Sequence, residues 1–177
     1  ATEVFAVDIV PAYIAGSNEF GDHTYVVPEI VRSGHATRKL TYAEASKGHR
    51  RINWIRSDPR GYTTVATIVN QRNEDFRHAV KLVKGWRAAC RRARPEFALK
   101  SFHAEQVITG FYLANDTIDV SAATLEFFRT LPEIMERPRI RDRADSAVFI
   151  DEYLSSISQA RRGEVVQAGQ DIAERLG

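Results

Sequence analysis

The sequence predicts an α+β fold in which a few short antiparallel strands are followed by a bundle of helices. Residues 3–14 and 24–31 are rich in apolar and β-branched side chains, and the intervening AGSNEFGDH is rich in turn-forming residues. From residue 73 onward, apolar residues instead recur every three or four positions, which is typical of helices. Strands gathered before helices are the pattern of an α+β chain.

Length and composition are those of a folded protein with one domain, or one domain and an appendage. The chain has 177 residues, of which 44% are hydrophobic and 27% are charged. Residues 32–64 are punctuated by glycine and proline, so we expect them to be irregular, with SDP at 57–59 marking a turn or a helix start. We therefore expect a first domain over 1–64 and a helical domain over 65–177.

The clearest helix is expected to begin near Asn73, an N-cap candidate followed by two acidic residues. Pro95 ends it or restarts the chain. Further helices are expected over about residues 101–113, 121–136, 149–160 and 163–176, with Pro132 kinking or ending the one over 121–136. The apolar stripe of the first helix consists of Phe76, Val80, Val83, Trp86, Cys90 and Ala93.

The distribution of charge and the number of cysteines limit the kinds of partner and compartment that the chain can have. The net charge is only +2, but eight basic residues lie between Arg77 and Lys100 against one acid, Glu96. Such a basic face suits an anionic partner, while the near-neutral total gives no strong signal for nucleic acid. Cys90 is the only cysteine, which excludes an intrachain disulfide and fits a reducing cytoplasm. We expect a cytoplasmic protein without a membrane span, because no apolar stretch approaches 18 residues.

Several familiar catalytic motifs are absent from the sequence. It contains no glycine-rich phosphate loop, no HExxH, no Gly-x-Ser-x-Gly and no CxxC. The five histidines show no spacing typical of metal ligands, so we interpret them as surface or helix-lining residues.

The first candidate site residue is Asp8, a single carboxylate within the strand-like EVFAVDIVPAY. A carboxylate on a half-buried strand must be paired, hydrogen-bonded or metal-bound. A salt bridge to an arginine and a role as a Mg²⁺ ligand are both compatible with the residues themselves. A two-metal site needs two or three such acids, and no other acid lies close by on an obvious strand.

The second candidate site combines KLVKGW at 81–86 with LKSFHAE at 99–105. Ser101 stands where a helix is expected to begin, and a helix N-terminus with a free hydroxyl suits phosphate. Lys84 would supply a compensating charge, and Phe102 could stack on a nucleobase. Equally, Lys84 could be a solvated lysine, Ser101 a simple N-cap and Phe102 a core residue.

Taken together and in order, VDIVPAY, WIRSDP, VKLVKGW and LKSFHAE resemble the cyclic-oligonucleotide synthases of bacterial anti-phage signalling. These enzymes are relatives of oligoadenylate synthase and of cyclic GMP–AMP synthase in the polymerase-β-like nucleotidyltransferase superfamily. The resemblance spans about residues 3–110. The segment IRDRADSAVFIDEYLSSIS is similar to the C-terminal region of the family, with less specificity.

The resemblance implies a role for each matching residue. Asp8 matches the third metal-binding carboxylate of the family, and Lys84 matches a lysine near the donor triphosphate. Ser101 and Phe102 match a serine at the phosphates and an aromatic ring against a base. The other matches are Pro11 and Ala12 after the acid, and Trp54, Asp58 and Pro59, whose implied role is structural.

The family also places GSxxxGT and an Asp-x-Asp pair upstream of the third acid, and the sequence contains neither. We therefore expect the chain to be the C-terminal portion of such an enzyme, with an incomplete nucleotidyltransferase sheet and an oligoadenylate-synthase-like helical domain. The chain by itself is then expected to be inactive. A separate N-terminal fragment of the same protein is an expected partner.

The function implied is the joining of nucleoside triphosphates into a cyclic di- or trinucleotide, with Mg²⁺ or Mn²⁺ as cofactor. Regulatory proteins of a defence operon are further implied partners. Two alternatives stay open: an RNA- or protein-modifying nucleotidyltransferase of the same superfamily, and a non-catalytic nucleotide-binding or helical interaction module.

Overall fold

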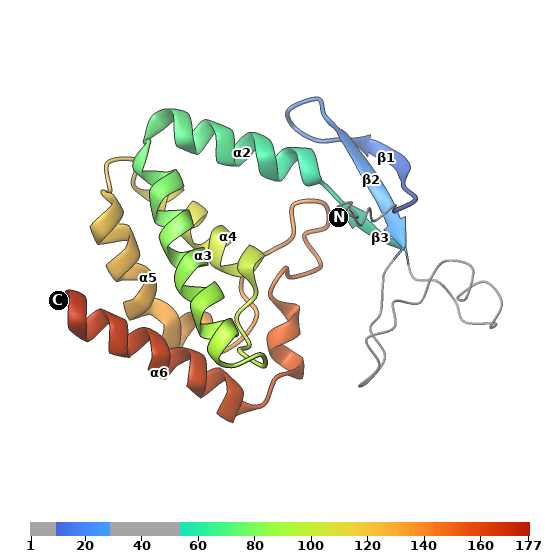
Figure 1. Cartoon of the computed structure of the whole chain (residues 1–177). Coiled ribbons are helices and arrows are strands. Elements are labelled where there is room, and N and C mark those ends of the chain that lie inside the picture. The colour runs from blue at the N-terminus through green and yellow to red at the C-terminus, as the bar shows by residue number, and fades with distance from the viewer. Residues whose placement is uncertain (1–9, 29–53) are drawn as a thin grey trace, which may run out of the picture. The chain divides into compact units, whose positions relative to one another are not determined.

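The structure, a computed structural model, describes residues 10–28 and 54–177 (Figure 1). In this part of the chain it has one three-stranded antiparallel sheet and five α-helices, which confirms the predicted α+β class. The described residues fall into two compact units: 10–28, 54–62 and 143–145 form unit 1, and 63–142 with 146–177 form unit 2. No helix among them is long and apolar enough to cross a membrane.

The sheet of unit 1 contains β1 (Tyr13–Ser17), β2 (His23–Pro28) and β3 (Trp54–Ser57), in that order. The antiparallel pairing predicted for the first two strands is confirmed, with Tyr13 opposite Val26. Their bounds differ from the prediction, since residues 10–12 lie outside the strand and β1 continues to Ser17.

A tight turn explains why β1 extends further than predicted. The side-chain oxygen of Asn18 accepts the backbone N–H groups of Phe20 and Asp22, both at 2.9 Å. Gly21 has a φ of 82°, a left-handed conformation that glycine adopts without steric cost. Because residues 18–22 suffice to reverse the chain, the flanking residues remain available for pairing.

The prediction that all of 32–64 is irregular is wrong for its described part. Strand β3 pairs with β2, and helix α2 (Pro59–Arg72) follows directly. Asp58 starts this helix by accepting the Gly61 N–H at 2.9 Å, with Pro59 at the first helical position. SDP is therefore a helix start, one of the two possibilities predicted. Residues 29–53 lie outside the described part.

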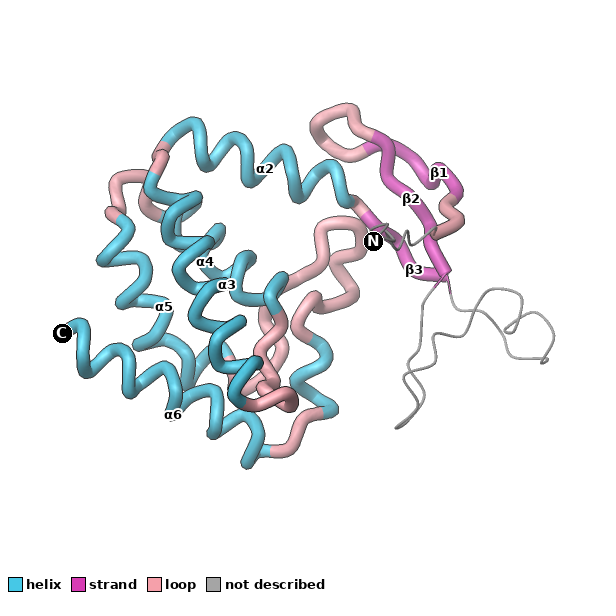
Figure 2. The backbone as a smooth tube through the Cα atoms, in the orientation of Figure 1, coloured by secondary structure: helices cyan, strands magenta, loops and turns pink. Residues whose placement is uncertain are grey.

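Most of the helices predicted for unit 2 are confirmed. They are α3 (Asp75–Ala93), α4 (Ser101–Ala114), α5 (Val120–Ile134) and α6 (Gln159–Leu176). The helix expected over 149–160 is instead a short 3₁₀ helix, η1 (Glu152–Ser156), at the end of the long loop that follows α5 (Figure 2). Helix α6 begins earlier than predicted because Ser158 caps it, accepting the Arg161 N–H at 3.4 Å.

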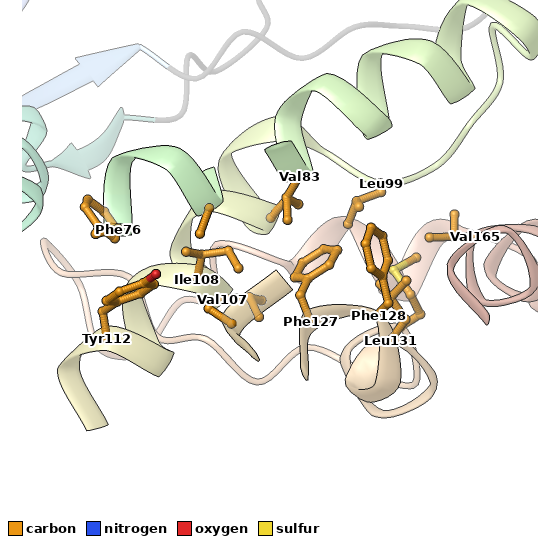
Figure 3. Close-up of a cluster of buried hydrophobic side chains, with 14 of the residues drawn as sticks. Phe76, Val83, Leu99, Val107, Ile108, Tyr112, Phe127, Phe128, Leu131 and Val165 are labelled. Atoms are coloured by element: carbon orange, nitrogen blue, oxygen red, sulfur yellow. The ribbon is translucent and has the colours of Figure 1, made fainter. Parts of the chain in front are cut away.

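The core of unit 2 is built by the facing sides of α3, α4 and α5. Val83, Ile108 and Phe127 are fully buried, and their side chains point toward one another in the close-up of the core (Figure 3). Trp86 packs edge-on against Phe128, with ring centroids 5.0 Å apart. The predicted stripe of α3 therefore faces the interior from Phe76 to Cys90, whereas Ala93 at its end is exposed. Lys84 stands beside this stripe.

Candidate functional site

Three of the four predicted site residues lie in unit 2, and one cannot be placed. Asp8 lies outside the described residues, so its role stays a prediction. Lys84 is on α3, whereas Ser101 and Phe102 open α4. These two helices pack directly against each other.

An ion pair joins the two predicted motifs. The Nζ of Lys84 donates to Oε2 of Glu105, which lies in the first part of α4. Glu105 follows Ser101 by four residues, so both project from the same face of α4, about 6 Å apart along its axis. The Lys84 ammonium is thereby held about one helical turn from the N-terminus of α4. Both partners of the pair remain partly accessible to solvent.

The N-terminus of α4 has the form expected of an anion site. Ser101 is the first helical residue, and Lys100 before it has an extended backbone. Within the described residues, Lys100 makes no side-chain capping bond to this helix. The first-turn N–H groups of a helix carry partial positive charge and attract anions. Phe102 is 40% exposed, so it is not a core residue as the alternative interpretation would have it.

The segment before α4 is held by hydrogen bonds from two other elements. Nε of Arg87, on α3, donates to the carbonyl oxygen of Leu99 at 2.8 Å. The backbone N–H of Lys100 donates to the hydroxyl of Tyr153 at 3.2 Å, and the Lys100 ammonium lies over the Tyr153 ring, 4.2 Å from its centre. These contacts fix the chain immediately before Ser101, which fixes the direction in which α4 starts.

A cluster of buried polar side chains, which the sequence did not reveal, supports the start of α4. His103 and Asp151 are each 1% exposed, and Nδ1 of His103 lies 2.8 Å from the Tyr153 hydroxyl. The carboxylate of Asp151 accepts the backbone N–H groups of Arg139 and Ile140 at 2.8 and 3.1 Å. His103 therefore joins α4 to η1 through Tyr153, and Asp151 holds the loop after α5.

The hydrogen bonds of this cluster centre on the Tyr153 hydroxyl. It accepts the backbone N–H of Lys100 and lies within hydrogen-bond distance of Nδ1 of His103. Nε2 of His103 faces Oδ2 of Asp151 at 3.7 Å, beyond hydrogen-bond distance. Burial lowers the pKa of His103 to about 4, although Asp151 acts in the opposite direction. Burial also raises the pKa of Tyr153 to about 12. Both groups are therefore neutral at pH 7.

Sequence reasoning missed this cluster because its signals are weak. His103 falls four residues before Val107, on the apolar side of α4, and Asp151 falls among apolar residues in FIDEY. A polar residue on an apolar face indicates a buried partner but does not identify it. The interpretation of His103 as a helix-lining residue agrees with its buried position.

The described residues do not by themselves form a metal site. They contain no group of three His, Cys, Asp or Glu side chains that could hold a metal ion. The Lys84 and Glu105 pair supplies one carboxylate, and that carboxylate is already matched by a cation.

Comparison with known proteins gives no independent assignment. No protein-family model matches the chain, and neither a curated protein nor a solved structure does so. The arrangement of Lys84, Ser101, Phe102 and Glu105 is therefore interpreted on its own geometry.

Proposed function

We propose that the chain is the donor-phosphate-binding portion of a nucleotidyltransferase that joins nucleoside triphosphates into a cyclic di- or trinucleotide for anti-phage signalling. The observation that carries the proposal is the ion pair between Lys84 and Glu105. It sets the lysine of one motif about one turn from the serine of the other. The sheet of unit 1 would then be part of a larger nucleotidyltransferase sheet.

Each residue has a distinct task in this proposal. The Lys84 ammonium neutralises phosphate charge, and the Ser101 hydroxyl and the first turn of α4 donate hydrogen bonds to phosphate oxygens. The exposed Phe102 ring supplies a face for the base. Catalysis of phosphoryl transfer consists largely of such positioning and charge neutralisation. A Mg²⁺ or Mn²⁺ ion held in part by Asp8 would neutralise further phosphate charge.

The shift of the protein's melting temperature on adding ATP, with and without Mg²⁺, tests the phosphate site. Lys84→Ala is expected to abolish most of the shift, measured against the same variant without ATP. Lys81→Ala, an exposed lysine one turn earlier on α3, is the matched control and should keep it. An equal shift in wild type and Lys84→Ala would contradict the proposal.

Glu105→Gln gives a sharper test, because a phosphate-binding role of Lys84 and a purely structural role predict different ATP affinities for this variant. If Lys84 binds phosphate, removing the competing negative charge tightens ATP binding by about 3–10-fold, a typical effect for a partly exposed charge. If the pair is purely structural, the same variant only lowers the melting temperature and leaves ATP binding unchanged. Isothermal titration calorimetry separates these results.

Chromatography of the products formed from mixed nucleoside triphosphates tests the reaction itself. The 177-residue chain is expected to release no product. A longer protein that also supplies an Asp-x-Asp pair is expected to make a cyclic di- or trinucleotide, and Asp8→Asn should abolish it without unfolding. Extended RNA ends or nucleotidylated protein would favour the RNA- or protein-modifying alternative. ATP binding without any product from that longer protein would favour the non-catalytic module.

A further inference from the structure

Unit 2 contains an apolar pocket that the proposed nucleotide site does not use. Its volume is about 470 Å³, within the range of small-molecule sites. Side chains of α3, α5 and α6 line it, among them Leu82, Trp86, Leu125, Ile172 and Leu176. Leu82 and Leu176 are 55% and 58% exposed, so these apolar side chains face solvent at a pocket that remains partly open.

The polar groups of the pocket are few. Among the residues that line it, only Ser121 and Thr124, with their hydroxyls, and Trp86, with its indole N–H, carry polar groups on their side chains. The Thr124 hydroxyl already donates to the carbonyl oxygen of Val120 at 2.6 Å. The Ser121 hydroxyl, on the exposed side of α5, and the Trp86 indole N–H are therefore the side-chain hydrogen-bonding groups that the lining offers a ligand. A nucleotide, with its many polar atoms and its triphosphate, does not match this lining.

Arg129 does not itself line the pocket, but it lies on α5 beside residues that do. Arg129 follows Leu125 by four residues and Ala122 by seven, so it projects from the pocket side of α5. Its guanidinium lies 3.7 Å from where a side chain at Gly177 would begin, next to the pocket residue Leu176. Within residues 10–28 and 54–177, Arg129 forms no ion pair. An exposed arginine beside an apolar cavity suits a ligand with one anionic group.

We propose that this pocket binds an apolar carboxylate, with the apolar body between Trp86 and Leu125 and the acid group on Arg129. The apolar lining accounts for the body of the ligand. The Arg129 guanidinium, which has no ion pair among the described residues, accounts for its single charge. The volume is that of a small molecule. The proposal does not depend on the nucleotide site, because it uses a different set of residues and can be measured without nucleotide.

Tryptophan fluorescence provides a direct measurement in the full chain. The sequence has two tryptophans, so Trp54→Phe leaves Trp86, in the pocket wall, as the only reporter. The probes are decanoate and the uncharged decanol, both below micelle-forming concentrations. We expect decanoate to change the Trp86 emission in a saturable way, and to bind more tightly than decanol.

Two kinds of variant in this Trp54→Phe background test the two parts of the proposal. Arg129→Gln should weaken decanoate binding about tenfold, the usual effect of losing a charge-assisted hydrogen bond, and should leave decanol unchanged. Arg92→Gln, an exposed arginine in the last turn of α3, is the charge-matched control. Ala122→Phe, which fills the pocket, should abolish binding of both probes. If circular dichroism shows that Ala122→Phe is unfolded, Ser121→Leu replaces it.

Three results would overturn the proposal. A response that does not saturate, and that persists in the filled variant, means that the probes only partition onto the surface. Equal binding of decanoate and decanol removes the assignment of a carboxylate. Equal loss of decanoate binding in Arg129→Gln and Arg92→Gln means that general charge, and not the mouth of the pocket, attracts the probe.

Discussion

At the scale of single residues, the cluster of His103, Tyr153 and Asp151 shows how burial sets the charge of a side chain. His103 lies near a carboxylate, which would normally favour its charged form. Burial outweighs that attraction and lowers the pKa of His103 to about 4. The imidazole is therefore neutral, and its hydrogen bond with the Tyr153 hydroxyl is part of the support for α4.

The lowered pKa of His103 predicts that acid destabilises the fold. Between pH 6.5 and 4 the unfolded chain binds a proton at this histidine, whereas the folded chain does not, so stability falls as the pH falls. The loss reaches about 3 kcal/mol near pH 4 for a shift of this size. Urea unfolding at several pH values measures it. His103→Gln should flatten the pH dependence, whereas His78→Gln, an exposed histidine on α3, should not. Parallel curves for wild type and His103→Gln would contradict the assignment.

At the scale of elements, two glycines of α6 have opposite structural roles. A side chain at Gly169 would overlap that of Leu131 and come within 3.5 Å of the Phe128 ring, both on α5. Among the described residues, nothing lies within 4 Å of a side chain placed at Gly163. Gly169 therefore permits the close approach of α5 and α6, and Gly163 has no packing reason to be glycine.

Alanine substitution in α6 should separate these two roles. Gly169→Ala is expected to destabilise the protein by about 1–3 kcal/mol, because overpacking against a fully buried leucine outweighs the gain in helix propensity. Gly163→Ala, in the same helix, should instead stabilise it by about 0.5–1 kcal/mol. Urea unfolding of the two variants at one pH provides the comparison. If both substitutions stabilised the protein, Leu131 would have to move aside without lowering the free energy of unfolding.

The elements also show which features the sequence could predict. The helices α3, α4 and α5 were predictable because their apolar spacing is local, and SDP marked the start of α2. Strand β3 was not, because a four-residue strand depends on its pairing with β2. In the same way, Ser101 could be placed at a helix start from the sequence. The partner of Lys84 could not, because an ion pair between two helices depends on how those helices pack.

At the scale of the whole molecule, the two units differ in how much apolar surface they bury. In unit 1, Tyr13 and Ile14 of β1 are 63% and 64% exposed. In unit 2, Ile108 and Phe127 are fully buried. Local stability follows buried contacts, so unit 1 should open at a lower free energy than unit 2. A single two-state transition is not expected for such a chain.

Hydrogen exchange should resolve this difference and identify what holds unit 1 together. Arg143 donates to Glu19 and lies 3.6 Å from the buried carboxylate of Asp58, which also accepts from Asn18. Arg143→Ala leaves that carboxylate without its cation, a loss of about 1–3 kcal/mol. This loss of free energy corresponds to hydrogen exchange of the β2 amides that is about tenfold faster or more.

The amides of α4 around Ile108 serve as the internal reference in that experiment, because they belong to unit 2 and should exchange as slowly as before. Arg139→Ala is the matched control, since Arg139 pairs with the exposed Glu133 and Glu136 within unit 2. Exposed pairs contribute little, so this variant should leave both units unchanged. Equal acceleration of β2 and α4 in Arg143→Ala would mean that the chain opens as one cooperative unit, and that the sheet is stabilised through the helical core and not through Arg143 and Asp58.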